Sequence, residues 1–294
     1  MFEFTITVLG LLFGSFANVC IWRIPRGEEI VRTPSHCPAC GAGISWYDNI
    51  PLASFLLLLG RCRSCHARIP WRYPLVEAAC AALFLVLYAR FGRDWRLLGY
   101  LPLAWALLVT TAVDLRHYVI PEAISRGGTA FALALAGAAA LFPPLGLSVS
   151  GLGAAGRFAP LADALAGAAV GGGLIALVAW FGRRWYRQEA MGSGDIELAA
   201  MIGAFLGWKG VLLTIFLAVL TGSVAGLGLL GLGRAKDTNE LNRTVYADDP
   251  LVRDAVGPVA AKAAVPFGPF LALGAMLSAL FGSRLIGWYG GLFR

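Results

Sequence analysis

Charged side chains are scarce in this sequence. Only 14% of its 294 residues are Asp, Glu, Lys or Arg, whereas about 25% is usual for a soluble globular domain. Apolar residues fill the deficit: they make up 58% of the chain and give it a mean hydropathy of +0.71. This composition excludes an ordinary soluble protein and indicates an integral membrane protein.

Acidic residues are scarcer than basic ones, and the net charge is +7. A basic excess also occurs in proteins that bind nucleic acid. In membrane proteins, however, Lys and Arg concentrate in the cytoplasmic loops and set the orientation of the chain. We therefore assign the excess to topology, and we expect membrane lipid and no nucleic acid among the partners.

The apolar runs predict an all-α polytopic membrane protein with about eight transmembrane helices, because about 20 apolar residues span a bilayer. The first helix covers residues 1–22, and we expect it to stay as an anchor because no basic region or convincing cleavage site marks a removed signal peptide. The other predicted spans lie within residues 75–294, at about 75–91, 97–113, 123–141, 161–181, 195–208, 211–232 and 266–281. Arginines that follow the first and fifth spans place those ends in the cytoplasm and both termini outside. Residues 233–264, rich in acidic side chains, are predicted to form an exposed cytoplasmic loop.

Cysteine is rare outside one polar stretch, residues 23–74. Four of the six cysteines form two Cys-x-x-Cys pairs in that stretch: Cys37, Cys40, Cys62 and Cys65. Two thiolates three positions apart on a tight turn bind one metal well, and four of them complete a tetrahedral zinc site with no open position. We therefore predict a small cytoplasmic domain, inserted after the first helix and held together by structural Zn²⁺. His36 and His66 adjoin the pairs as alternative ligands, and disulfides are the alternative in an oxidising compartment.

Two aspartates lie where an apolar run meets a basic loop. Asp114 ends the run at 97–113, and Asp195 follows a Gly-Ser-Gly sequence. Counting spans from an external N-terminus places both at the cytoplasmic face. Ionisable groups at membrane depth are costly and therefore tend to be functional or paired. Two carboxylates held close in a poorly solvated site share a proton, so one acts as a base toward water while the other acts as an acid.

The glycines beside the second aspartate add to this interpretation. Gly192 and Gly194 lack side chains, so the backbone there can approach a substrate chain closely. The alternative is a polar turn in which Asp195 merely caps a helix. The short motif alone does not decide between the two.

Taken together, the motifs resemble those of the prepilin peptidases, which are bacterial aspartic membrane proteases with a Gly-x-Gly-Asp motif. The agreement runs in order along nearly the whole chain. The matching segments are Gly14-Ser15-Phe16 with Asn18 and Val19, Arg23 and Pro25, the two cysteine pairs, Trp46-Tyr47-Asp48-Asn49-Ile50-Pro51, Arg72-Tyr73-Pro74-Leu75-Val76-Glu77, Asp114 with Ile120-Pro121, Gly192 to Asp195, and Pro266-Phe267-Gly268-Pro269-Phe270.

The resemblance implies a function. Asp114 and Asp195 would be the catalytic pair of an endopeptidase in the bacterial inner membrane, with its active site facing the cytoplasm. Its substrates would be type IV prepilins and pseudopilins, cut between a short basic leader and an apolar helix. Many members also methylate the new N-terminus with S-adenosylmethionine, and the cysteine-bearing domain accompanies that activity, so we expect a bifunctional enzyme.

The chain departs from the family pattern at two acidic residues. Glu197 stands where the family commonly has lysine, and Glu122 stands where it commonly has aspartate or asparagine. Neither departure removes a predicted catalytic group. Two other classes remain as alternatives: a transporter, because glycine-rich and short spans occur in carriers, and a zinc-stabilised membrane scaffold without catalytic activity.

Overall fold

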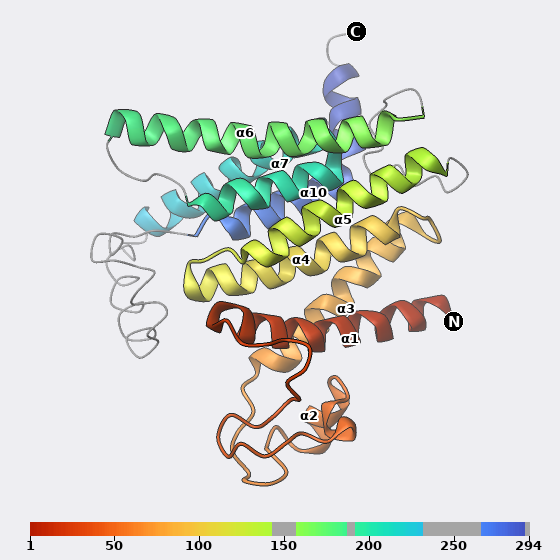
Figure 1. Ribbon diagram of the computed structural model, residues 1–294, viewed down its shortest axis with the longest axis vertical. Helices are drawn as coiled ribbons and strands as arrows, with labels where there is room; N and C mark the ends of the chain where they lie inside the picture. Colours follow the sequence, from red (N-terminus) through yellow and green to blue (C-terminus); the bar gives the residue numbers. More distant parts are fainter. Residues whose placement is uncertain (143–156, 187–191, 232–265, 292–294) are drawn as a thin grey trace. The chain divides into compact units, whose positions relative to one another are not determined.

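The computed structural model describes residues 1–142, 157–186, 192–231 and 266–291, and these residues are almost entirely helices and short connections. They fall into two compact units, Met1–Asp94 and Trp95–Arg294. Figure 1 labels the helices of both units. The predicted loop at 233–264 lies entirely outside the described residues. The helical content confirms the predicted all-α class.

The first unit contains two long helices, α1 (Phe2–Arg23) and α3 (Arg72–Phe91). They cross at glycines, where a Cβ added at Gly10 would lie 2.6 Å from the Cα of Ala81, and one at Gly14 would lie 2.6 Å from the Cα of Glu77. Small residues at a crossing let two backbones approach closely, which is how helices associate in lipid. The crossing therefore fixes α1 against α3 through backbone packing.

The cysteine-bearing segment joins these two helices. It contains the short helices η1 (Ile24–Arg26), η2 (Trp46–Asn49) and α2 (Ala53–Leu57). Arg23 is buried at the end of α1, where its guanidinium donates hydrogen bonds to the carbonyl oxygens of Thr33, at 2.7 Å, and Pro34, at 3.1 Å. A buried charge that satisfies loop carbonyls in this way stabilises a segment too small for a large apolar core.

In the described part of the second unit, five helices form a bundle: α4 (Leu97–His117), α5 (Glu122–Leu141), α6 (Ala159–Tyr186), α7 (Ser193–Gly231) and α10 (Gly268–Gly291). Its centre is apolar, with Leu103, Leu107 and Leu198 almost fully buried. Helices α6 and α7 cross at Gly167 and Gly203, where a Cβ on either residue would run into the backbone of the other. This glycine contact brings the first half of α7 against α6.

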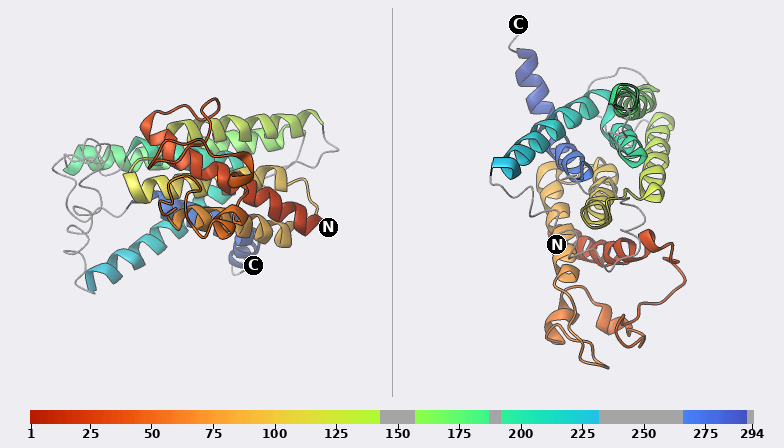
Figure 2. Two further views of the ribbon diagram at one scale, coloured as in Figure 1. Left: turned by 90° about the horizontal axis from the view of Figure 1, so that it is seen from below. Right: turned by 90° about the vertical axis from the view of Figure 1, so that its left-hand side faces the viewer.

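Seven described helices are long and apolar enough to cross a membrane, whereas the sequence predicts about eight spans. The difference lies in α7, whose 39 residues would reach about 58 Å if straight, roughly twice the thickness of a bilayer core. Gly207 interrupts α7 with φ 74° and ψ 175°, a conformation that favours glycine. Figure 2 shows the two halves of α7 running in different directions.

The contacts of Gly171 on α6 also show that α7 turns back. A Cβ at Gly171 would meet the carbonyl oxygen of Ala199 and would lie 2.8 Å from Cγ2 of Val211. Those residues would be about 18 Å apart along a straight helix. The halves of α7 therefore correspond to the two predicted spans at 195–208 and 211–232.

Candidate active site and metal centre

Asp114 lies in the last turn of α4, and its side chain is buried, with a residue exposure of 5%. The helix ends because Tyr118 adopts a left-handed conformation, with its N–H donating to the Asp114 carbonyl oxygen at 2.9 Å. The Asp114 carboxylate accepts a hydrogen bond at Oδ2 from the backbone N–H of Gly268, at 3.0 Å. Gly268 is the first residue of α10, and a helix N-terminus is a favourable place for an acidic group.

Asp195 lies in the first turn of α7 and is half-buried. Its backbone N–H donates to the carbonyl oxygen of Gly192 at 3.2 Å, which closes the turn at the helix start. The charge of Asp195 acts on Asp114, so the two carboxylates share one electrostatic site. Residues 81 positions apart in sequence are thus brought together by the ends of α4 and α7.

This arrangement can perform acid–base chemistry. Two neighbouring carboxylates in a poorly solvated site titrate as a pair and can hold one proton between them. Such a pair can take a proton from water and give one to a substrate carbonyl in the same step. The geometry is therefore suited to hydrolysis of an acyl bond.

The two predicted glycines differ in their surroundings. A Cβ at Gly194 would lie 2.7 Å from Cβ of Ile120, so α7 begins in direct contact with the corner between α4 and α5. A Cβ at Gly192 would have only the carboxylate of Asp195 and the N–H of Gly194 nearby, at 3.9 and 4.0 Å. The absence of a side chain at 194 thus serves packing. Approach of a substrate at these glycines stays a prediction.

The four predicted cysteines converge in the first unit. Their sulfur atoms all lie within 4.8 Å of one another, and those of Cys37 and Cys65 are 3.9 Å apart. Four thiolates about 2.3 Å from one zinc ion would have a similar spacing of about 3.8 Å. No disulfide joins the cysteines. The donor set therefore fits one tetrahedral metal ion.

The two cysteine pairs have the same backbone design. In each pair the carbonyl oxygen of the first cysteine accepts a hydrogen bond from the backbone N–H of the residue just after the pair. The N–O distances are 2.8 Å from Gly41 to Cys37 and 3.0 Å from His66 to Cys62. Gly41 and His66 both adopt positive φ, at 72° and 57°. His66 therefore occupies the turn position of Gly41. Both it and His36 are exposed and lie outside the group of possible ligands found among the described residues.

The thiols differ in acidity. Backbone N–H groups of Cys65 and Ser64 lower the pKa of the Cys62 thiol to about 7. Although the backbone N–H of Ala67 acts to lower it, the pKa of the Cys65 thiol is raised to about 11 by hydrogen bonding with Cys40 and by burial. One sulfur thus ionises first, and binding of a metal ion would displace the protons of the others.

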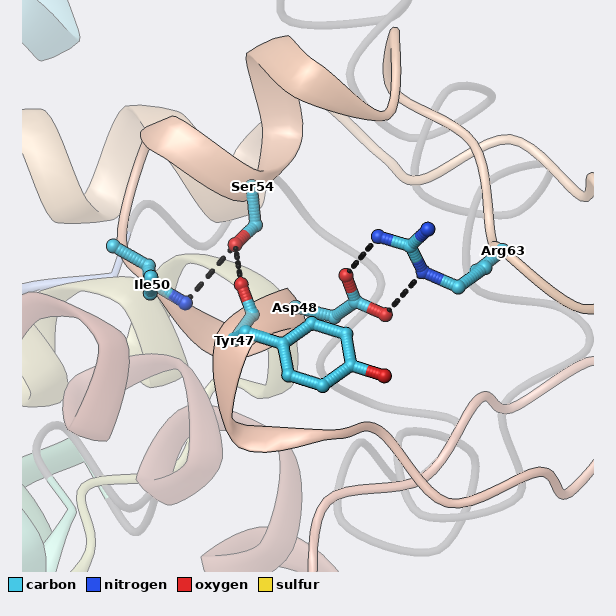
Figure 3. Close-up of polar contacts among 5 residues, drawn as sticks. All are labelled: Tyr47, Asp48, Ile50, Ser54 and Arg63. Carbon is cyan, nitrogen blue, oxygen red and sulfur yellow. Dashed lines mark hydrogen bonds and ion pairs between the residues drawn. The ribbon is translucent and has the colours of Figure 1, made fainter.

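A polar cluster holds the segment between the pairs (Figure 3). Arg63 donates two hydrogen bonds to Asp48, from Nε at 2.7 Å and from Nη2 at 2.6 Å, and these bonds lower the pKa of Asp48. Ser54 donates to the carbonyl oxygen of Tyr47 at 2.9 Å and accepts from the N–H of Ile50 at 3.0 Å. The second cysteine pair is thereby tied to η2 and to α2.

A cavity of about 300 Å³ also lies in the first unit. Its lining includes the polar residues Asn18 and Glu77 and the apolar residues Leu52 and Phe55. Glu77 is buried and accepts the N–H of Leu52 at Oε2, at 2.8 Å. The volume is at the lower end of the usual range for ligand pockets, and the lining combines polar with apolar residues, which is compatible with a small-molecule site.

The fold and the site define a multi-pass membrane protein with a carboxylate pair in one unit and a four-cysteine centre in the other. Comparisons with known proteins identify the family. Residues 8–91 match the Bacterial Peptidase A24 N-terminal domain, and residues 101–227 match the Type IV leader peptidase family. No solved structure matches the chain.

Similar proteins extend the agreement to nearly the whole chain. A prepilin leader peptidase/N-methyltransferase of Myxococcus xanthus is 40% identical over 85% of this chain and 70% of its own length. A protein of the same name from Pseudomonas putida is 33% identical over 95% of this chain and 90% of its own length. The chain belongs to the Type IV leader peptidase family, which confirms the resemblance inferred from its motifs.

Two residues of the site carried no assigned role in the sequence. Gly268 was recognised only as part of a motif, because a backbone N–H leaves no signature in its side chain. Arg126 on α5 belongs to none of the sequence motifs, yet it binds both acidic residues at which the chain departs from the family pattern. The ion pair between Arg126 on α5 and Glu197 on α7 depends on how the two helices pack. It cannot be predicted from the local sequence.

Proposed function

We propose that this protein is an aspartic endopeptidase of the bacterial inner membrane that removes the short basic leader of type IV prepilins and pseudopilins at the cytoplasmic face. The observation that carries the proposal is the meeting of Asp114 and Asp195 at the ends of α4 and α7, with the Gly268 N–H on Asp114. Membership of the leader peptidase family supports the substrate class.

In the proposed reaction the ionised carboxylate of the pair accepts a proton from water, and the resulting hydroxide attacks the scissile carbonyl carbon. The protonated partner gives its proton to the developing oxyanion. When the carbon–nitrogen bond breaks, the protonated carboxyl gives its proton to the leaving amine and the other carboxylate takes a proton from a hydroxyl of the tetrahedral intermediate, so the pair is again singly protonated. The Gly268 N–H orients Asp114 throughout.

The test is cleavage of a co-reconstituted prepilin by the wild type, Asp114→Asn and Asp195→Asn, with mass spectrometry of the mature N-terminus. Loss of cleavage in both folded variants is expected. Asp163→Asn is a matched control, since Asp163 is also buried in this unit but lies on α6. Wild-type cleavage by both Asp114→Asn and Asp195→Asn would refute the proposal. The transporter and scaffold interpretations would then be favoured.

We propose that the metal of the cysteine centre is zinc in a structural role. Cys37, Cys40, Cys62 and Cys65 would occupy all four positions of a tetrahedral ion, which leaves none open for a substrate. The ion would tie the two knuckles of this segment to each other. Metal analysis of the purified protein, with one zinc ion expected per chain, tests this assignment.

We propose a second activity, N-methylation of the new N-terminus, because the relatives carry this activity in their name and the first unit contains a cavity suited to a methyl donor. S-adenosylmethionine supplies an activated methyl group on a sulfonium cation. Glu77 would provide the opposite charge, and the Leu52 and Phe55 side chains would provide apolar surface for the adenine ring.

Calorimetric titration of the purified protein with S-adenosylmethionine tests the methyl-donor site. Glu77→Gln retains an acceptor for the Leu52 N–H but removes the charge, so we expect affinity to fall about tenfold or more, as for a lost charged contact worth about 1.5–3 kcal/mol. Glu3→Gln, at an exposed acidic residue of α1, is the control. Unchanged affinity in Glu77→Gln would place the donor elsewhere.

A further inference from the structure

Arg126 joins two helices through a three-residue ionic cluster. On α7, Oε1 of Glu197 accepts hydrogen bonds from Arg126 Nε at 2.9 Å and Nη2 at 2.7 Å. On α5, Oε2 of Glu122 lies 2.9 Å from the same Nη2. One guanidinium therefore bridges two carboxylates, and we refer to Glu122, Arg126 and Glu197 as the bridging cluster.

The bridging cluster lies next to the catalytic pair in the chain. Glu197 is two residues after Asp195, and α7 turns by about 200° over two residues, so the two side chains leave the helix in nearly opposite directions. Arg126 therefore holds the side of α7 that faces α5 while Asp195 is directed to the other side. The first turn of α7 is fixed from α5 as well as from α4.

Close packing on this side flanks the ion pair along α7. Gly194 contacts Ile120 just before α5 begins, and about two turns further along both helices a Cβ at Gly128 would meet the side chain of Met201. The helix begins with Ser193-Gly194, and glycine restricts the backbone weakly, so the first turn of α7 depends on contacts with its neighbours. The Arg126–Glu197 ion pair lies between the two packing contacts and adds a polar link near the start of α7.

Burial makes Glu197 dependent on Arg126. The Glu197 side chain is 22% exposed, whereas Arg126 and Glu122 are 66% and 58% exposed. Oε2 of Glu197 is buried and has no hydrogen-bond partner among the described residues. A largely buried carboxylate that loses its counter-ion moves toward solvent, because burial of an unpaired charge is costly. Loss of Arg126 would therefore shift the turn that carries Asp195.

We infer that Arg126 and Glu197 are positioning residues for catalysis: their ion pair holds Asp195 in register with Asp114. This inference rests on the proposed peptidase function. Because Glu197 leaves α7 on the side opposite Asp195, we expect the ion pair to act on turnover and to leave substrate binding unchanged. Glu122 shares the guanidinium and keeps it in place on α5.

The experiment measures kcat and KM for prepilin cleavage by the full-length protein in lipid nanodiscs. Arg126→Ala is expected to lower kcat about fivefold to tenfold with KM unchanged. This lies between the small effect of an exposed ion pair and the roughly hundredfold effect of a misplaced catalytic group. Glu197→Ala should have a similar effect, and the double variant should be no slower than the slower single variant, since both remove one interaction.

A charge exchange separates positioning from general damage. Glu197→Lys combined with Arg126→Ala places an ammonium where it can reach Glu122, because both carboxylates now contact the same nitrogen. We expect this pair of substitutions to restore at least half of wild-type kcat. Arg184→Ala removes an exposed arginine at the end of α6 and should leave kcat unchanged.

Three results would overturn the inference: wild-type kcat in Arg126→Ala, an equal loss in Arg184→Ala, or a failure of the charge exchange to restore kcat although thermal unfolding matches the wild type. These outcomes are independent of the dyad experiment. If Asp114→Asn and Asp195→Asn abolish cleavage while Arg126→Ala is fully active, the peptidase proposal stands and the positioning role fails.

Discussion

Substitution of Gly268 by alanine should impair catalysis strongly while leaving the bundle folded. The new Cβ would lie inside van der Waals contact with Oδ2 of Asp114 and 3.2 Å from its Cγ. Relief of the overlap needs a displacement of about 1 Å between α10 and the carboxylate, and a displacement of this size can reduce a rate about 100-fold. The same movement lengthens the 3.0 Å bond from the Gly268 N–H, and hydrogen bonds to charged groups contribute about 1.5–3 kcal/mol.

Both routes lead to a similar magnitude, since a 100-fold loss corresponds to about 2.7 kcal/mol. The assay is kcat/KM for prepilin cleavage, with thermal unfolding of the same samples as a measure of folding. Gly287→Ala is a matched control, because Gly287 lies on the same helix and an added Cβ meets nothing within 4 Å. Wild-type kcat/KM in a folded Gly268→Ala protein would show that the Asp114 contact with α10 has no part in catalysis.

Further predictions concern the metal centre and the bundle. Cys40→Ser should abolish binding of the proposed zinc ion and expose residues 24–71 to proteolysis, because a structural zinc site stabilises its segment directly; metal analysis and limited proteolysis measure this. Gly203→Val should lower the unfolding temperature and abolish cleavage, since its side chain would collide with the backbone at Gly167, and forced overpacking costs about 1–3 kcal/mol. Asp163→Ala should cost about 1–3 kcal/mol, because Oδ1 of Asp163 accepts the Trp208 N–H, at 3.4 Å, where α7 resumes after its break.

Each of these has its own comparison. Cys20→Ser should retain zinc, since Cys20 is buried in α1 outside the metal group, and retention of zinc by Cys40→Ser would contradict the assignment. Gly137→Ala, where an added Cβ meets nothing within 4 Å, should unfold at the wild-type temperature. Asp163→Asn keeps an acceptor for Trp208, so equal destabilisation by Ala and Asn would show that this hydrogen bond is not the cause.

Local sequence was sufficient for the class of protein and for most of its elements. Exposing polar groups to lipid is costly, so membrane helices need long apolar runs. These runs can be identified from the sequence without a structure. The cysteine pairs could also be predicted as a metal site from the sequence, because metal ligands must have a particular chemistry and spacing. The structure confirms the convergence of Cys37, Cys40, Cys62 and Cys65, although it was the fold that brought two pairs separated by 21 residues to one point.

The span count shows where sequence patterns lose precision. The prediction separated 195–208 from 211–232, and the structure assigns one helix, α7, that is broken at Gly207. Glycine occurs both inside membrane helices and in turns. The local sequence around Gly207 therefore does not distinguish one broken helix from two separate helices. The positive φ of Gly207 and the acceptor supplied by Asp163 depend on α6 lying alongside.

The sequence by itself determined that this chain is a polytopic membrane protein and, through the order of its motifs, that it resembles the leader peptidase family. It also predicted two aspartates at one membrane face and a four-cysteine metal site. The membrane character and the cysteine pattern follow from residue chemistry and spacing, which are local, whereas the family follows from the resemblance of its motifs to those of known members. Only the tertiary structure decided that the Gly268 N–H binds Asp114 and that Arg126 bridges Glu122 and Glu197. These contacts join residues on different helices, and their formation depends on how the helices pack, which no local pattern records.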